Sequence, residues 1–220
     1  MRTHRSPRDL SNLPYAHHLE PFTREVQRKE VYEWIHIDSQ DMDDSDRDMS
    51  RFIESAFSSV NFNGGRMQHG RFDTVWMHNV RLLGADLTST TWLDTECRSS
   101  LLAGTQLHGA ELQRTVFHQC KLDSVNLRGA TLRDVAFIDC SLSDVDFGGA
   151  TLKRVSFPGT SLEQVDFTKG SLAQVDLREV TALGLASGAE DLRGAIINTR
   201  QLLDLAPDLA QHAGLTVKDD

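Results

Sequence analysis

Several features that would point directly to a function are scarce in this 220-residue chain. The three cysteines, Cys97, Cys120 and Cys140, are too few and odd in number for a disulfide framework. No apolar run reaches the roughly 18 residues of a membrane-spanning helix. The N-terminal residues MRTHRSPRDL lack the apolar stretch of a secretory signal. Together these absences favour a cytoplasmic protein that does not enter a membrane.

The charge and the short motifs are equally restrictive. A net charge of −9 does not provide the basic field that binding to nucleic acid requires. The sequence has no glycine-rich phosphate loop, no nucleophile elbow and no Cys-x-x-Cys motif. Its histidines do not gather at the spacing of metal ligands. We therefore expect no enzymatic activity, no cofactor, no metal and no direct contact with nucleic acid.

The sequence does contain a long internal repeat. Every fifth residue from Phe52 to Leu177 is apolar, without a single insertion. In GATLRDVAFIDCSLSDVDFGGATL, residues 129–152, these positions are Leu132, Phe137, Leu142, Phe147 and Leu152. The residue two places before each of them is small or β-branched, and the remaining three positions are largely polar.

This period matches neither a helix nor a simple strand, which would repeat every three to four or every two residues. Two inward and three outward residues in five fit a chain that turns a corner every five residues. Four such corners close a square coil, and coils roughly 4.8 Å apart stack as a solenoid. Residues one coil apart then stack in columns, with the structural core including Phe117, Phe137 and Phe157 on one side and Phe147 and Phe167 on the opposite side.

Stretches such as VNLRGATL, VDFGGATL and VDFTKGSL resemble the pentapeptide-repeat consensus A-(D/N)-L-x-x. The resemblance implies an all-β solenoid, a right-handed quadrilateral parallel β-helix, over residues 32–197, with its regular part at 52–177. Tyr32, Ile37 and Met42 keep the register before this part. Arg47 is expected to break it, because an arginine cannot fill a dry core slot without a partner.

An open solenoid needs covers at both ends. We expect residues 1–31 to form a flexible tail, with a short helix over residues 22–35 that begins at Thr23. Residues 198–220 are predicted to form a helical cap that starts at Asn198 or Thr199, with a kink or a second helix at Pro207. Because related quinolone-resistance proteins pair through this end, the resemblance also implies a homodimer, with candidate interface residues Leu202, Leu205, Leu209 and Leu215.

Two pairs of side chains one coil apart deserve an interpretation of their own. Cys120 and Cys140 are inward and are expected to be buried, reduced thiols. Asp146 and Asp166 point outward. Two carboxylates about 5 Å apart, on adjacent coils, could in principle form the catalytic pair of a glycosidase. Since the repeat often has Asp or Asn at this position, where the side chain can bond to nearby backbone, we expect a structural role instead.

The resemblance also implies a function. Several pentapeptide-repeat proteins bind type II topoisomerases: a rod with the width and charge of duplex DNA occupies the DNA-binding saddle of gyrase. This binding inhibits the enzyme or protects it from poisons such as fluoroquinolones. Candidate contact residues for such a partner are the acidic side chains Asp86, Asp139, Asp144, Asp146 and Asp166.

The alternative is an interaction scaffold of unknown partner with no topoisomerase activity. Trp76 and Val116 are apolar where the repeat is usually polar, so they are candidate partner-binding residues in either case. The N-terminal segment folding back over them is an equally good interpretation of the sequence.

Overall fold

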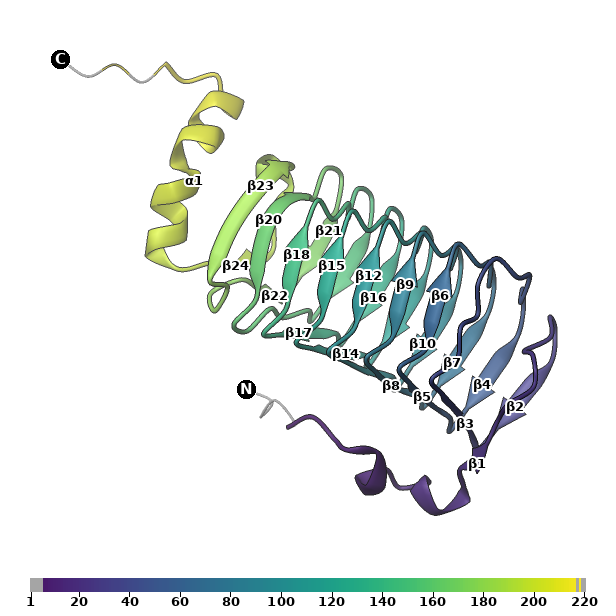
Figure 1. The fold of residues 1–220 in the computed structure, drawn as a ribbon. Helices are drawn as coiled ribbons and strands as arrows, with labels where there is room; N and C mark the ends of the chain where they lie inside the picture. The colour runs from purple at the N-terminus through teal and green to yellow at the C-terminus, as the bar shows by residue number, and fades with distance from the viewer. Residues whose placement is uncertain (1–5, 217, 219–220) are drawn as a thin grey trace.

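The computed structural model describes residues 6–216 and 218 as a right-handed parallel β-solenoid of about 8 turns, closed at its C-terminal end by one α-helix (Figure 1). The coils follow one another along a straight rod, from the N-terminal coils in purple to the helix in yellow. The quadrilateral β-helix predicted from the five-residue repeat is confirmed.

Three sides of the rod are parallel sheets. The first sheet consists of β1 (Glu20–Pro21), β3 (Ile35–Asp38), β5 (Ala56–Ser58), β8 (Trp76–His78), β11 (Glu96–Arg98), β14 (Val116–His118) and β17 (Ala136–Ile138). The second sheet consists of β2 (Val31–Glu33), β4 (Arg51–Ile53), β7 (Arg71–Asp73), β10 (Thr91–Leu93), β13 (Glu111–Gln113), β16 (Thr131–Arg133), β19 (Thr151–Lys153) and β21 (Ser171–Ala173). The third sheet consists of β6 (Asn61–Asn63), β9 (Arg81–Leu83), β12 (Leu101–Ala103), β15 (Lys121–Asp123), β18 (Ser141–Ser143), β20 (Ser161–Asp166) and β23 (Ala182–Ser187).

The fourth side of the rod has single bridges in place of strands, from Asp46 to Asp166. Each coil visits the second sheet, the first sheet, the third sheet and then the fourth side, so the second and third sheets lie opposite each other. The register between coils is regular: Leu132 pairs with Leu112 on one side and Leu152 on the other. A short pair, β22 (Val175–Asp176) with β24 (Ala195–Ile196), extends the rod beyond the last regular coil.

The core contains every fifth residue from Phe52 to Leu177, each of them at most 6% exposed. Phenylalanine rings one coil apart are nearly parallel: the centroids are 4.9 Å apart for Phe117–Phe137, 5.2 Å for Phe137–Phe157 and 5.2 Å for Phe147–Phe167. Such pairs add about 0.5–1.5 kcal/mol each beyond the burial of their area. The columns predicted from the sequence are confirmed.

The second inward position is small because it faces the backbone of the preceding coil. Threonine hydroxyls there donate to main-chain carbonyls, as Thr160 Oγ1 does to Phe137 O at 2.8 Å. Cys120 and Cys140 take the same position as free, buried thiols, as predicted. The Cys120 backbone N–H donates to Cys140 Sγ at 3.4 Å, so the thiol replaces the threonine hydroxyl as a hydrogen-bond partner.

The chain turns its corners with left-handed backbone. The residue two places after many core centres has a positive φ, for example 51° at Arg114 and 61° at Gly104. Outside glycine this conformation costs about 1–2 kcal/mol per residue. The hydrogen bonds between coils hold it in place: Arg114 N donates to Arg133 O at 3.0 Å in the next coil.

Arg47 occupies a core position, although the sequence predicted that it would break the repeat there. Its side chain is buried, with Nη1 donating to Met42 O at 2.9 Å and the guanidinium 6.0 Å from the centroid of the Phe62 ring. Gly65 provides the space, since a Cβ at that residue would lie 3.2 Å from Nη1. Burial lowers the pKa of Arg47. The repeat therefore continues back to Tyr32.

The N-terminal region also differs from the prediction. No helix forms over residues 22–35; this region contains β2 and ends at the first residue of β3, and the side chains of Phe22 and Val26 join the end of the core. Before it, the short 3₁₀ helices η1 (Leu10–Asn12) and η2 (Ala16–His18) pack along the rod in place of a flexible tail. Residues 1–5 of the predicted tail lie outside the described residues.

The C-terminal cap is helix α1 (Thr199–His212), which follows the 3₁₀ helix η3 (Ala189–Asp191). It starts as predicted: Asn198 Oδ1 accepts from Gln201 N at 3.0 Å, and Gln201 Oε1 accepts from Asn198 N at 2.9 Å. Gln201 Nε2 also donates to Leu177 O at 2.7 Å, which satisfies a carbonyl of the last regular coil. Pro207 lies within this single helix. Among the described residues, no helix is long and apolar enough to span a membrane.

Replacing Phe137 tests the contribution of the ring column. Phe137→Ala is expected to lower the free energy of unfolding by about 3–5 kcal/mol, because it leaves a cavity between two stacked rings. Phe137→Leu is the control, since leucine fills the same slot in other columns, and its cost should be clearly smaller. Urea denaturation followed by circular dichroism measures both; equal costs would contradict the role of the stacked rings.

Candidate protein-binding surfaces

The acidic column on the fourth side has a structural role. One carboxylate oxygen of each aspartate accepts from the backbone N–H two residues later: Thr88 N to Asp86 at 3.0 Å, Gly148 N to Asp146 at 2.7 Å and Thr168 N to Asp166 at 2.7 Å. Asn126, in the same column, accepts from Arg128 N at 3.1 Å in the same way. These bonds close the turn at the corner, as the structural interpretation of Asp146 and Asp166 predicted.

Hydrogen bonds of this kind lower the pKa of Asp86 and of Asp166. Burial alone would raise the pKa of Asp166, but hydrogen bonds from Thr168 and Ser187 outweigh it and hold that pKa below the usual 3.8. The second oxygen of Asp146 pairs with the Arg128 guanidinium at 3.1 Å. The carboxylates of this column are therefore partly committed to contacts within the chain.

A less committed acidic surface lies on the third sheet and the corners on either side of it. We call Asp139, Asp144, Glu163 and Glu179 the acidic patch; all four are exposed. Asp144 and Glu163 are on adjacent coils, joined by a backbone hydrogen bond of 3.0 Å. None of the four forms an ion pair with another described residue. Asp139 and Asp144 were predicted as contact residues, whereas Glu163 and Glu179 were not.

The opposite side of the rod is charged in a different way. On the second sheet and its corner, arginines pair with aspartates one coil away: Arg114 binds both oxygens of Asp94, at 2.6 and 2.7 Å. Arg154 binds both oxygens of Asp134, at 2.7 and 2.7 Å. These pairs neutralise part of the charge on this side of the rod, whereas the acidic patch has no such ion partners among the described residues.

Trp76 is not an exposed contact residue. It is 3% exposed, because the N-terminal segment packs over it together with Leu13 and Tyr15. The sequence allowed Trp76 either to bind a partner or to be covered by the N-terminal segment, and the structure has it covered. Val116, one strand beyond the covered region, is half-buried, and a partner role for it remains a prediction.

The candidate dimer residues at the C-terminal end differ in their exposure. Leu205 is buried against the end of the rod, so it serves the cap and is not free for a second chain. Leu202 and Leu215 are exposed, Leu209 is half-buried, and Leu203, which the sequence analysis did not single out, is 69% exposed. The helix therefore caps the core with one side and leaves leucines on its other side uncovered.

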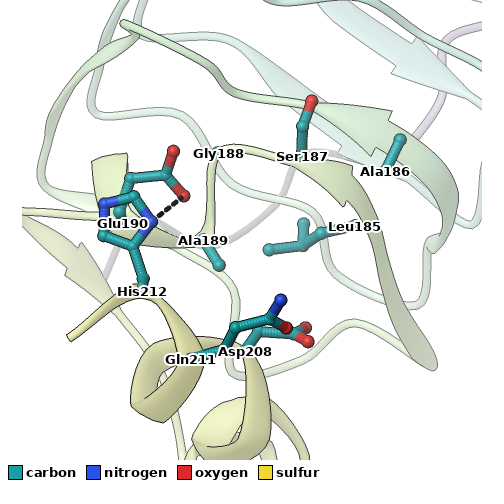
Figure 2. Close-up of a pocket in the computed structure, with 9 residues that line it drawn as sticks. All are labelled: Leu185, Ala186, Ser187, Gly188, Ala189, Glu190, Asp208, Gln211 and His212. Carbon is teal, nitrogen blue, oxygen red and sulfur yellow. Dashed lines mark ion pairs between the residues drawn. The ribbon is translucent and has the colours of Figure 1, made fainter. Parts of the chain in front are cut away.

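A cleft of about 520 Å³ separates the second half of α1 from the last coil (Figure 2). Leu185 and Ala189 line it from the rod, and Asp208 and Gln211 line it from the helix. At one edge, His212 Nδ1 lies 3.7 Å from Glu190 Oε2. The described residues contain no group of three or more His, Cys, Asp or Glu side chains that could hold a metal ion.

Comparison with known families agrees with this architecture. A profile of the pentapeptide repeat region matches residues 110–186, and a profile of eight pentapeptide repeats matches residues 81–119. The chain belongs to the pentapeptide-repeat family. Proteins with this fold are generally non-catalytic structural or interaction proteins. No curated protein sequence matches the chain significantly.

Solved pentapeptide-repeat structures are similar only at low identity. A trypsin-treated variant of QnrB1, a plasmid-mediated fluoroquinolone resistance protein, has 13% identity and a TM-score of 0.46, covering 84% of this chain and 99% of that one. HetL from the cyanobacterium Nostoc, involved in heterocyst differentiation regulation, has 19% identity and a TM-score of 0.24, covering 77% and 90%. A thylakoid lumen protein of Arabidopsis thaliana has 21% identity and a TM-score of 0.29, covering 54% and 66%. These values are too low for a function to transfer.

The turn-closing carboxylates predict a pH-dependent contribution to stability. Because the folded-state pKa of Asp166 is depressed, its contribution is present above the usual pKa of 3.8 and is lost as the pH falls through the folded-state value. Asp166→Asn should therefore destabilise the chain most at neutral pH, with the difference shrinking in acid. Urea unfolding of both chains over a pH series measures this.

Glu163→Gln is the matched control, because the Glu163 carboxylate has no hydrogen bond or ion pair with a described residue. Its effect on stability should be small throughout the same pH series. A constant difference between wild type and Asp166→Asn across the series would contradict the assigned role of the charge.

Proposed function

We propose that the chain is a non-enzymatic rod that binds a type II topoisomerase, such as DNA gyrase, by presenting its acidic patch to the DNA-binding groove. The observation that carries the proposal is the location of the uncompensated charge: Asp139, Asp144 and Glu163 are exposed without ion partners among the described residues, while the opposite side carries arginine–aspartate pairs. The family resemblance supplies the class of partner.

The proposed mechanism is imitation of duplex DNA. Consecutive coils place carboxylates along one side of a rigid rod at steps of roughly 4.8 Å, and a basic groove attracts them as it attracts phosphates. A topoisomerase that holds the rod does not hold DNA, so supercoiling is inhibited or the enzyme is protected from poisons such as fluoroquinolones. The three free thiols fit the reducing cytoplasm, where such enzymes act.

A second candidate function, an interaction scaffold, has one observation in its favour. Val116, Ala136 and Ile138 form a half-buried apolar area on the first sheet, where outward residues of the repeat are usually polar. A partner bound there would depend on apolar contact. Its affinity would change little with salt, whereas binding through the acidic patch would weaken as salt screens the charges.

A gyrase supercoiling assay with the purified chain, with and without a fluoroquinolone, tests the topoisomerase proposal. We expect inhibition or protection that weakens as ionic strength rises. Asp144→Asn/Glu163→Gln removes two negative charges without changing side-chain size, and should raise the concentration needed for half-effect by roughly tenfold, equivalent to about 1.4 kcal/mol.

Glu33→Gln/Glu111→Gln is the matched control, since it removes the same charge from exposed residues of the opposite sheet. It should act like the wild type. If the wild-type chain has no effect on gyrase from its own source at any concentration, the topoisomerase proposal is wrong. If both double variants lose activity equally, the assignment to the acidic patch is wrong.

We further propose that two copies pair through the outer side of α1. Leu202 and Leu203 are 49% and 69% exposed there, and Ile196 lies exposed close to the start of the same helix. A second copy would bury these residues and would double the length of the rod with twofold symmetry.

Leu202→Asp/Leu203→Asp is expected to turn a dimer into a monomer, since it places charge in the proposed apolar contact. The control Val31→Asp/Met49→Asp makes the same change at exposed apolar residues of the opposite end. Sedimentation velocity over a concentration series measures the mass of each. A wild-type chain that is monomeric at high concentration would contradict this proposal.

A further inference from the structure

The N-terminal segment lies along the outside of the first sheet and has contacts with strands far away in the sequence. We call residues 8–21 the strap. At one end β1 adds to β3, with Glu20 N donating to Trp34 O at 2.7 Å. From there the strap runs back past β5 and β8 to β11 (Figure 1). It therefore covers the outer surface of three coils.

The far end of the strap is held by an arginine in a polar recess. Arg8 N and Arg8 Nε donate to the two carboxylate oxygens of Glu96, at 2.8 and 2.7 Å. The Glu96 side chain is 8% exposed, compared with 42% for Asp94 in the surface pair with Arg114. A shielded, charge-assisted contact of this kind is stronger than a surface ion pair, and breaking it leaves a buried charge.

Two further side chains of the rod donate hydrogen bonds to the backbone carbonyl of that arginine. Trp76 Nε1 donates to Arg8 O at 3.0 Å, and Arg98 Nη1 donates to the same carbonyl. Arg98 also pairs with Asp9 Oδ1 at 2.9 Å. The recess thus recognises a guanidinium, the carbonyl of the same residue and a following carboxylate.

The middle of the strap is held by apolar contact. Leu13 and Tyr15 are buried against Ala56 and Trp76. Tyr15 Oη donates to Ser55 O at 3.4 Å, and burial raises the pKa of Tyr15. Leu13 and Tyr15 follow Arg8 by five and seven positions. This spacing defines a sequence pattern for a ligand of this surface.

The strap leaves one polar atom of the surface beneath it without a hydrogen bond, and it does not cover the apolar residues farther along the first sheet. His78 Nδ1 is buried beneath it, next to the Trp76 indole, and has no hydrogen-bond partner among the described residues. A buried polar atom without a partner costs about 1–3 kcal/mol. Beyond the strap, the half-buried Val116, Ala136 and Ile138 continue the apolar surface. A ligand that reached these groups would bind better than the strap does.

We propose that Trp76, Glu96 and Arg98 form a peptide-binding site, in which the strap is a resident ligand that an arginine-bearing extended segment of a partner protein displaces. The ligand carries an arginine, an apolar residue five positions later and an aromatic residue seven positions later. Because the strap is tethered at an effective concentration of roughly millimolar, the partner replaces it through additional contacts at His78 and Val116. This site is separate from the acidic patch.

A labelled synthetic peptide with the strap sequence SPRDLSNLPYAHHL, residues 6–19, tests the site on the full-length chain. Wild type should bind it weakly, because its own strap competes. Arg8→Ala weakens the resident strap and should bind the peptide at least roughly tenfold more tightly. Adding Glu96→Gln to Arg8→Ala removes the carboxylate that binds the peptide's arginine, and it should reverse the gain in affinity for the peptide. Fluorescence anisotropy gives the dissociation constants.

Arg114→Ala is the matched control, since it removes an arginine–carboxylate pair of similar geometry from another side of the rod. It should bind the peptide no better than wild type, and a peptide lacking the arginine should bind none of the chains. Thermal unfolding confirms that each variant is folded. If folded Arg8→Ala binds the peptide no better than wild type, the strap is a permanent part of the fold and the proposal is wrong.

Discussion

The hydrogen-bonded register between successive coils is the constraint on which the rest of this structure depends. Thr131 N donates to Ala110 O at 2.8 Å, and equivalent bonds repeat at almost every step along the rod. This register superposes each inward side chain on its counterpart in the next coil, so rings such as Phe137 and Phe157 stack. It also holds the left-handed corners that the chain would not adopt alone. Inward residues are thereby fixed, and outward residues are left free to vary.

The outward residues give each side of the rod its own chemistry. On the second sheet, pairs such as Arg114 with Asp94 neutralise part of the charge. The fourth side uses aspartates such as Asp146 to close turns. The side with Asp144 and Glu163 keeps uncompensated charge, and the first sheet binds the strap. A scaffold of one repeated design thus presents distinct surfaces without any change in its core.

The sequence predicted those features that the repeat itself determines, namely the Phe columns, the turn-closing role of Asp146 and the capping of α1 by Asn198. It offered the N-terminal segment folding back over Trp76 as one of two interpretations. It did not identify the contact that holds the strap, because Arg8 and Glu96 are 88 residues apart and no periodic pattern marks their contact. Arg47 was assigned wrongly because the space for its side chain comes from Gly65 in the next coil. The prediction of the acidic patch lacked Glu163 and Glu179, because the exposure and the pairing of a charged side chain depend on residues of neighbouring coils.

Excising one whole coil tests this account most directly. Removing residues 101–120 joins Ser100 to Lys121 and keeps the register, so the shortened chain should fold, with a cooperative thermal transition and the β-sheet circular dichroism of the parent. Removing residues 101–119 shifts the register by one residue and places Lys121 and Asn126 at core positions, so that chain should not fold. If the in-register excision unfolds as completely as the out-of-register one, the coil-to-coil register does not determine the fold.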